Sequence, residues 1–148
     1  MICSSITLAL DIKIKTVYNE SITNNESRGI SMENSNKWWL FIDDERFPID
    51  KYLDTFTIAR TYDEGVQLCE HRGCPQFISF DHDLGLESLT GHDFAKYLIE
   101  RDLDLDGAFI PDNFTFYVHS ANSVGRENIQ KLLDNYLAHR AKRGLKIK

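Results

Sequence analysis

Acidic side chains follow two apolar runs of the sequence, at the point where each run ends. The runs are WWLFI (38–42) and FISF (77–80). The side chains that follow them are Asp43 and Asp44 after the first run, and Asp81, His82 and Asp83 after the second. Carboxylates that converge repel one another unless a cation lies between them, and their oxygens suit Mg²⁺ or Mn²⁺. The pattern predicts a divalent-metal site, with solvated loop acids as the alternative. The candidate metal ligands are Asp43, Asp44, Asp81 and Asp83.

The polar turn HSANSVGR (119–126) follows a third apolar run, FTFYV (114–118). Gly125 permits close approach of the backbone, and a helix that begins near Val124 would offer free N–H groups and a positive dipole end. Arg126 can donate to two phosphate oxygens at once. We predict a phosphate site here, with an ordinary helix cap beside a solvated arginine as the alternative. The candidate phosphate ligands are Ser120, Asn122, Arg126 and, after the first acidic pair, Arg46.

Two histidines lie at these predicted strand ends. His82 and His119 could each move a proton in phosphoester chemistry, or could instead be hydrogen-bonding residues of the scaffold. The candidate catalytic residues are Asp81, His82 and His119. Asp81 is expected to be either a metal ligand or a covalent nucleophile.

The elements that would position these side chains alternate along the chain. Apolar runs with strand character are followed by helical patterns, which favours βαβ units and a parallel sheet with helices on both faces. The predicted strands cover residues 38–42, 55–61, 77–80 and 114–118, and the predicted helices cover 61–73, 91–102 and 124–144. In such sheets the ligand site lies outside the carboxyl ends of the strands. All three polar clusters are therefore expected at one edge.

The first 36 residues differ in character from the rest. Residues 6–18 alternate between apolar and polar side chains, which predicts a half-buried strand. Residues 19–36 are rich in Asn, Ser and Glu and are interpreted as a linker. We expect one α/β domain over 37–148, and we expect that residues 1–31 can be removed without unfolding it.

Composition excludes several classes of protein. A net charge of -6 argues against broad nucleic-acid binding, although a local basic patch could still bind a phosphate. The three cysteines have no metal-ligand spacing and are odd in number, which favours a reducing, cytoplasmic setting over a disulfide framework. No apolar run approaches membrane-spanning length, so no membrane partner is expected.

The motifs FIDDERFP, FDHDLG, TGHDF and VHSANSVGRENI resemble the response-regulator receiver fold. In this resemblance Asp43 and Asp44 correspond to the acidic pair of receivers and Asp81 to the phosphoacceptor. Gly91 corresponds to the glycine that opens the following helix, and Ser120 to the Thr or Ser after the fourth strand. More closely, the DDxRxP, DHDLG and HSxNxxGR signatures are similar to those of the cyclic-phosphate processing receiver family.

The resemblance covers residues 38–137 and implies a receiver-like (flavodoxin-like) doubly wound parallel sheet. Receivers end with a fifth strand that carries a lysine, whereas only LKIK remains here after the last helix. We therefore expect a sheet without that strand, with Arg126 in place of the lysine as the phosphate cation.

The same resemblance implies a function in processing cyclic or terminal phosphates on RNA ends or nucleotides. Combined with the acidic clusters, it predicts a phosphoesterase, hence a hydrolase, that depends on Mg²⁺ or Mn²⁺. One alternative is a signalling domain that a partner phosphorylates on Asp81. The other is a non-catalytic module that binds a phosphate or nucleotide. The sequence names neither the substrate nor a protein partner.

Overall fold

The computed structural model describes residues 38–85 and 89–147, with side chains described up to Arg143. The strand predicted at 6–18 and the linker at 19–36 lie outside the described residues.

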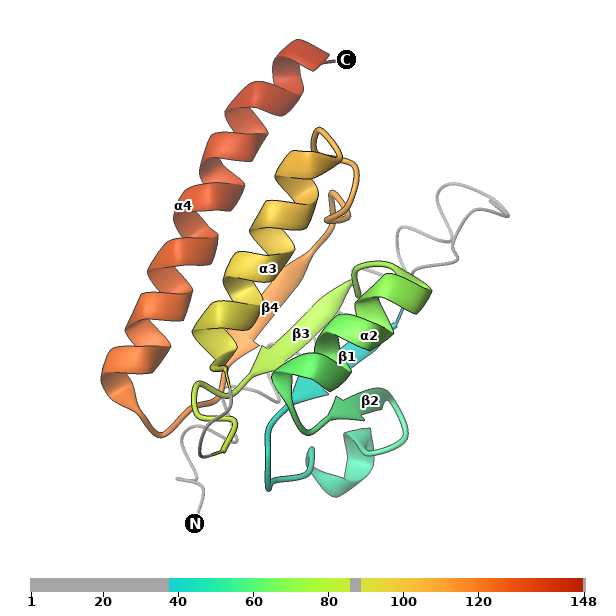
Figure 1. The fold of residues 1–148 in the computed structure, drawn as a ribbon, viewed down its shortest axis with the longest axis vertical. Coiled ribbons are helices and arrows are strands. Elements are labelled where there is room, and N and C mark those ends of the chain that lie inside the picture. The colour runs from blue at the N-terminus through green and yellow to red at the C-terminus, as the bar shows by residue number, and fades with distance from the viewer. Residues whose placement is uncertain (1–37, 86–88, 148) are drawn as a thin grey trace.

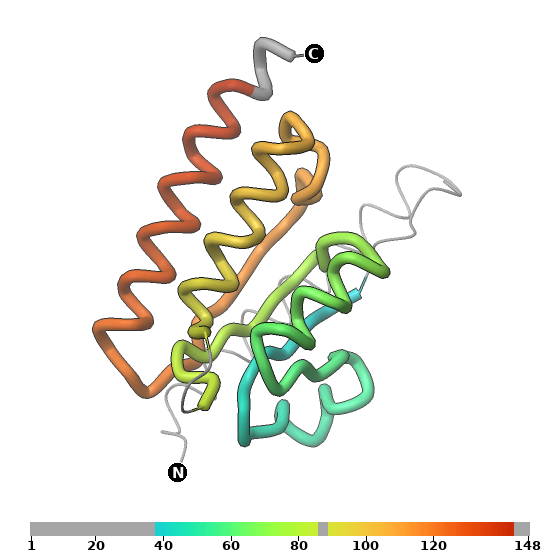
Figure 2. The backbone as a smooth tube through the Cα atoms, in the orientation of Figure 1, coloured from blue at the N-terminus to red at the C-terminus, as the bar shows by residue number. Residues whose placement is uncertain are grey.

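Four parallel strands form the sheet, in the spatial order β2-β1-β3-β4 (Figure 1). The strands are β1 (Trp39–Ile42), β2 (Phe56–Ala59), β3 (Phe77–Phe80) and β4 (Thr115–Val118). The helices are the short 3₁₀ turn η1 (Asp50–Tyr52), then α2 (Tyr62–Arg72), α3 (Gly91–Asp104) and α4 (Ser123–Ile147). Each of α2, α3 and α4 directly follows a strand along the chain, as Figure 2 shows. The predicted receiver-like α/β fold is confirmed. The expectation of helices on both faces is not met by the described residues, because side chains of α2, α3 and α4 all pack in the core on one face, whereas the other face has only the short η1, through Tyr52.

Helix starts follow the capping chemistry of the sequence. The Thr61 hydroxyl accepts the Glu64 amide at the start of α2, while the Glu64 carboxylate accepts the amide of Arg60. At α3, Thr90 and Asp93 form a reciprocal capping box, which satisfies N–H groups that the helix leaves unpaired. These caps fix where α2 and α3 leave the edge of the sheet at which the acids lie.

The last helix is longer than predicted. The sequence predicts residues 124–144, but α4 runs from Ser123 to Ile147 and takes up most of the final LKIK segment. Within residues 38–85 and 89–147 the sheet has no fifth strand, in agreement with the expectation that the last receiver strand is missing.

A buried carboxylate far from the predicted site joins α3 to α4. Asp102 is fully buried near the end of α3 and accepts the amides of Phe109 and Ile110 and the hydroxyl of Tyr136. The Arg140 guanidinium lies 3.4 Å from the same carboxylate. This polar cluster holds α4 against α3. The first turn of α4 lies at the other end of that helix, near the carboxyl ends of the strands (Figure 1).

The two faces of the sheet carry different side chains. Leu40, Ile42, Ile78 and Phe80 belong to a large core with side chains of α2, α3 and α4. The opposite face carries the buried rings Trp39, Phe41, Phe56 and Phe77. Trp38 and Trp39 fall in different clusters and are each 6% exposed, so neither indole is an exposed surface on which a base could stack.

Both cysteines in the described chain, Cys69 and Cys74, are buried free thiols. Burial, with a smaller effect of Glu70, raises the pKa of Cys69 to about 12, so this thiol is neutral and unreactive. In the described part of the chain, no helix combines the length and apolar character needed to cross a membrane.

Candidate functional site

Register brings the strand ends together at one level of the sheet. Ile42 pairs with Ala59 on one side and with Phe80 on the other, and Phe80 pairs with Val118. The residues that come next are Arg60, Asp43, Asp81 and His119, in order across the sheet from β2 to β4. Backbone hydrogen bonds continue the ladder through them, since the amides of Asp43, Asp81 and His119 bond to the preceding level. The predicted convergence is therefore a consequence of parallel register.

Three of these side chains form a compact buried cluster. Asp43, Asp81 and His119 are 0%, 4% and 3% exposed, and one potential ligand atom from each lies within 4.8 Å of the others. Alternation along the strands points them to the aromatic face, because Phe41 precedes Asp43 by two residues and Ser79 precedes Asp81 by two.

Asp43 is held ionised by donors on both carboxylate oxygens. Its Oδ1 accepts the amides of Glu45 and Arg46, each at 2.8 Å, and its Oδ2 lies 2.8 Å from Nε2 of His119. Burial alone would raise the pKa of Asp43, but the hydrogen bonds from His119 and the two amides outweigh it and lower the pKa to about 2. Asp43 therefore carries a negative charge in the interior.

His119 has both ring nitrogens committed. Nδ1 lies 2.7 Å from the Ser79 hydroxyl and Nε2 lies 2.8 Å from Asp43. Its ring stacks on Phe41, with 4.6 Å between centroids and 6° between planes. With every polar atom paired inside the protein, His119 orients Asp43 and has no free nitrogen for a substrate.

Asp81 has the opposite electrostatic balance. Burial raises its pKa, the nearby charge of Asp43 raises it further, and His119, Arg46 and a hydrogen bond from Ser120 only partly offset this. The amide of His82 donates to its Oδ1 at 2.9 Å. A buried carboxylate that resists ionisation beside one that is fully ionised is the kind of pair that a cation would stabilise.

The remaining predicted acids lie apart from the cluster. The half-buried Asp44 is next to Gly85, since a Cβ added there would contact its Oδ2 at 3.9 Å. Asp83 is exposed and its Oδ1 lies 3.0 Å from Nδ1 of His82. The structure thus groups Asp43 with Asp81 but turns Asp83 toward His82.

In the turn after β4, one predicted phosphate ligand caps the helix and another lies at the site. The hydroxyl of Ser120 accepts the Asn122 amide, and Oδ1 of Asn122 accepts the Gly125 amide at 3.0 Å, so Asn122 caps α4 as the alternative interpretation proposed. Arg126 is half-buried and donates to the carbonyl of Ser120 at 3.3 Å, so it lies at this edge and is not fully solvated.

Two glycines are required by close approach. A Cβ on Gly91 would overlap the carbonyl oxygen of Asp81, and one on Gly125 would overlap the ring of His82. Gly125 therefore gives room to an imidazole, whereas the sequence pattern predicted room for a phosphate. Both contacts pack helix starts against the end of β3.

Two arginines supply positive charge on the β1 side of the cluster. Nε of Arg46 lies 3.6 Å from Asp43, and its Nη1 lies 3.5 Å from the carbonyl of His119. Arg60, at the end of β2, donates to the carbonyls of Asp43 and Arg46. Arg60 is not among the predicted site residues, because the predicted strand runs to residue 61, whereas β2 ends at Ala59. Arg60 is the first polar residue after β2, and the position directly after a parallel strand is where a site residue is expected.

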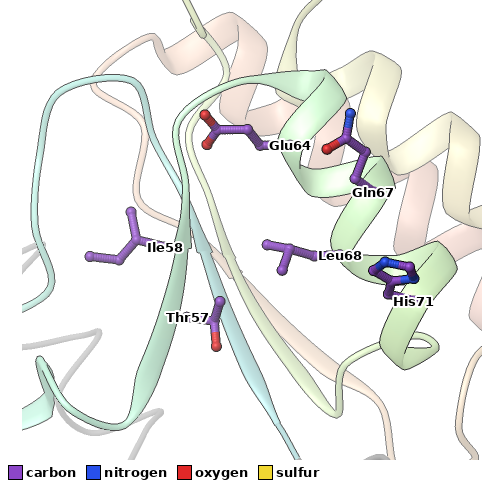
Figure 3. A pocket seen from close by; sticks show the side chains of 6 residues that line it. All are labelled: Thr57, Ile58, Glu64, Gln67, Leu68 and His71. Carbon is purple, nitrogen blue, oxygen red and sulfur yellow. The ribbon is translucent and has the colours of Figure 1, made fainter.

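A separate hollow of about 320 Å³ lies between β2 and α2 (Figure 3). Its lining residues are Thr57, Ile58, Glu64, Gln67, Leu68 and His71. None of the predicted site residues contributes to it, so the strand-end cluster remains the candidate site.

The carboxylate oxygens of the cluster suit a cation that prefers oxygen ligands. A carboxylate oxygen has two acceptor positions. In Asp43 the two amides fill those of Oδ1, but Oδ2 is hydrogen-bonded to His119 alone and keeps one position for a cation. Asp81 offers a second buried carboxylate to the same ion, since its ligand atom lies within 4.8 Å of that of Asp43. His119 does not fit as a ligand, because Ser79 and Asp43 engage its nitrogens.

No curated protein matches the sequence. A solved chain in which the yeast Spc42 trimeric coiled coil is fused to another structure is 16% identical, over 77% of this chain and 86% of that chain, with a TM-score of 0.44. The profile of one family, described as the cyclic-phosphate processing receiver domain, matches residues 38–135, which contain the whole sheet and the strand-end cluster. The chain therefore belongs to the cyclic-phosphate processing receiver domain family.

Proposed function

We propose that the strand-end edge binds a divalent cation together with a cyclic or terminal phosphate of a nucleotide or RNA end, and hydrolyses the phosphoester. The observation that carries this proposal is the buried pair of Asp43, with its pKa near 2, and Asp81, with its pKa raised by burial and by Asp43. A cation is the simplest way to let both carboxylates ionise.

Mg²⁺ or Mn²⁺ held by Asp43 and Asp81 would supply positive charge to the phosphoryl oxygens. The protein contributes cations of its own. Arg126 lies in the first turn of α4 and Arg46 lies beside Asp43, so the two guanidinium groups come from different elements that meet at this edge. Either can donate two hydrogen bonds to a phosphate.

The start of α4 adds backbone donors. Asn122 satisfies the Gly125 amide through its side chain and the Arg126 amide through its carbonyl. Within the described residues, the amides of Ser123 and Val124 are then left for solvent or a ligand at the positive end of a 25-residue helix.

His82 is better placed than His119 for proton transfer. Asp83 orients the His82 ring through Nδ1, and the described residues leave its Nε2 available. In hydrolysis a water oxygen bonds to phosphorus as the ester P–O bond breaks, and the departing oxygen takes up a proton. His82 can accept the proton of that water and return one to the departing oxygen.

The proposal is tested by titrating Mn²⁺ into the full chain and into Asp81→Asn, with Asp83→Asn as the matched control, and by assaying turnover of adenosine 2′,3′-cyclic phosphate with Mg²⁺. We expect Asp81→Asn to weaken Mn²⁺ binding at least about tenfold and Asp83→Asn to leave it unchanged.

Because Asp81 has a raised pKa, its ionisation disfavours the fold at neutral pH, so Asp81→Asn should melt no lower than wild type in metal-free buffer. Equal, weak Mn²⁺ binding by both proteins would refute the metal site, and metal binding without turnover would leave a binding module.

A second candidate is phosphorylation of Asp81 itself, as in signalling receivers. The hydrogen bond from Ser120 to Asp81 favours it, since it places a hydroxyl beside the acceptor carboxylate. Incubation with acetyl phosphate and Mg²⁺, followed by intact mass measurement, distinguishes the two. A stable added phosphoryl group that Asp81→Asn abolishes would support the switch.

A further inference from the structure

Phe47 is a large apolar side chain that is mostly exposed to solvent. Phe47 is 63% exposed, whereas each of the other fifteen phenylalanine, tyrosine and tryptophan residues in the described part of the chain is buried or half-buried. Single exposed hydrophobic residues are ordinary on protein surfaces, so exposure alone assigns nothing. The position of Phe47 and its partner are what make it informative.

One face of the Phe47 ring rests on a guanidinium. The Cζ atom of Arg60 lies 4.4 Å from the ring centroid, and Arg60 is itself fixed by the carbonyls of Asp43 and Arg46. Pro48 follows and is buried, which restricts the backbone of the residue before it. Phe47 is thus a supported ring that keeps exposed surface toward solvent.

The turn and the arginine that support the ring both belong to the candidate site. Phe47 belongs to the same turn as Arg46, whose amide caps Asp43. Arg60 and Asp81 occupy the same level of the sheet with Asp43 between them, which places them about two strand spacings apart, roughly 10 Å. A nucleotide that extends from its phosphate through the ribose to the base covers a distance of this order.

We propose that Phe47, backed by Arg60, is a stacking platform for the nucleobase of the ligand whose phosphate lies at Asp81 and Arg126. The inference rests on the proposed function and assigns the side chains that would hold the base of that nucleotide or RNA end. Unpaired bases stack on aromatic side chains, to which arginine adds a cation–π contribution, and such stacking tolerates any base because every base has a π-face.

The test compares two probes on the full chain by calorimetry with Mg²⁺ present: adenosine 2′,3′-cyclic phosphate, which has a base, and ribose 5-phosphate, which has none. The variants are Phe47→Ala, Phe47→Trp and, as the matched control, Leu103→Ala, an exposed apolar residue (49%) near the far end of α3. We expect Phe47→Ala to weaken binding of the adenosine probe about five- to hundredfold and to leave binding of ribose 5-phosphate unchanged. Phe47→Trp should restore or improve binding, and Leu103→Ala should leave it unchanged.

Each failure has its own signature. Equal affinity of wild type and Phe47→Ala for the adenosine probe would overturn the platform, while continued binding of ribose 5-phosphate would leave the proposed function standing. Wild type that binds neither probe would overturn both. A short RNA with a 2′,3′-cyclic end separates the two sources of the base. A larger effect of Phe47→Ala on this RNA than on the mononucleotide would support stacking of an RNA end, and an equal effect would support a free nucleotide.

Discussion

Two histidine–aspartate pairs lie at the same edge of the sheet and have the same chemistry but opposite surroundings. His119 and Asp43 are 2.8 Å apart with side chains 4% and 0% exposed. His82 and Asp83 are 3.0 Å apart with side chains 20% and 68% exposed. Nearly equal distances thus accompany very different environments.

The difference shows how burial assigns the roles. In the interior pair, Ser79, Asp43 and the Phe41 ring engage His119 on every side, so the pair fixes a charged carboxylate next to Asp81. In the surface pair, solvent screens the attraction and a ring nitrogen stays available. The buried pair is suited to holding charge in place, and the exposed pair is suited to exchanging protons with a ligand.

The largest effect is expected when the buried pair is broken. His119→Ala removes the partner of an ionised carboxylate that is 0% exposed, and breaking a buried pair in this way typically costs about 3–5 kcal/mol. His82→Ala should cost less, because it leaves Asp83 in water, and its cost should come from the lost packing of the ring against Gly125. Urea unfolding of both variants measures the contrast. Similar small losses would show that the interior pair adds little to the fold.

The second-largest effect is expected on the acid stability of the fold, to which the buried carboxylate Asp43 contributes. Because the pKa of Asp43 falls from 3.8 to about 2 on folding, its contribution is fully present above about pH 5 and is lost as the pH falls toward 2. The loss should amount to about 2 kcal/mol. Asp81, with its raised pKa, acts in the opposite direction, so the measurement belongs in an Asp81→Asn background.

Thermal melts between pH 2 and 7 provide this test. Adding Asp43→Asn should flatten the acid limb of the stability curve. An acid limb that survives Asp43→Asn would assign the titration to other carboxylates.

Much of the fold and the location of the site could be predicted from the sequence, because local chemistry and topology agree. Apolar runs of four or five residues marked β1, β3 and β4, and the Thr90 capping box marked the start of α3. Parallel order then required Asp43, Asp81 and His119 to meet at one edge, and the structure brings them within 4.8 Å.

The pairing within the site could not be predicted, because it depends on register and on which face each residue takes. Nothing in the sequence shows that Ser79 would reach Nδ1 of His119, forty residues away, and so withdraw that histidine from proton transfer. The support of Phe47 by Arg60 also depends on β2 ending at Ala59, and strand ends are uncertain by a few residues. Tertiary distances decide these roles.

The smallest effect is expected for the coupling within the exposed pair, and it gives the sharpest form of the comparison. A double-mutant cycle of His82→Ala and Asp83→Asn should give a coupling energy within about 0.2–1 kcal/mol, as for other solvent-exposed pairs, because water competes for Asp83 and salt screens the charge. The equivalent cycle of His119→Ala and Asp43→Asn should give a larger coupling, since each single change leaves a buried polar partner without its bond. Urea unfolding at low and at high salt measures both cycles, and only the surface coupling should shrink with salt. If the His82–Asp83 coupling equals the buried one and resists salt, the pair is part of the scaffold, and the proton transfer assigned to His82 would have to be abandoned.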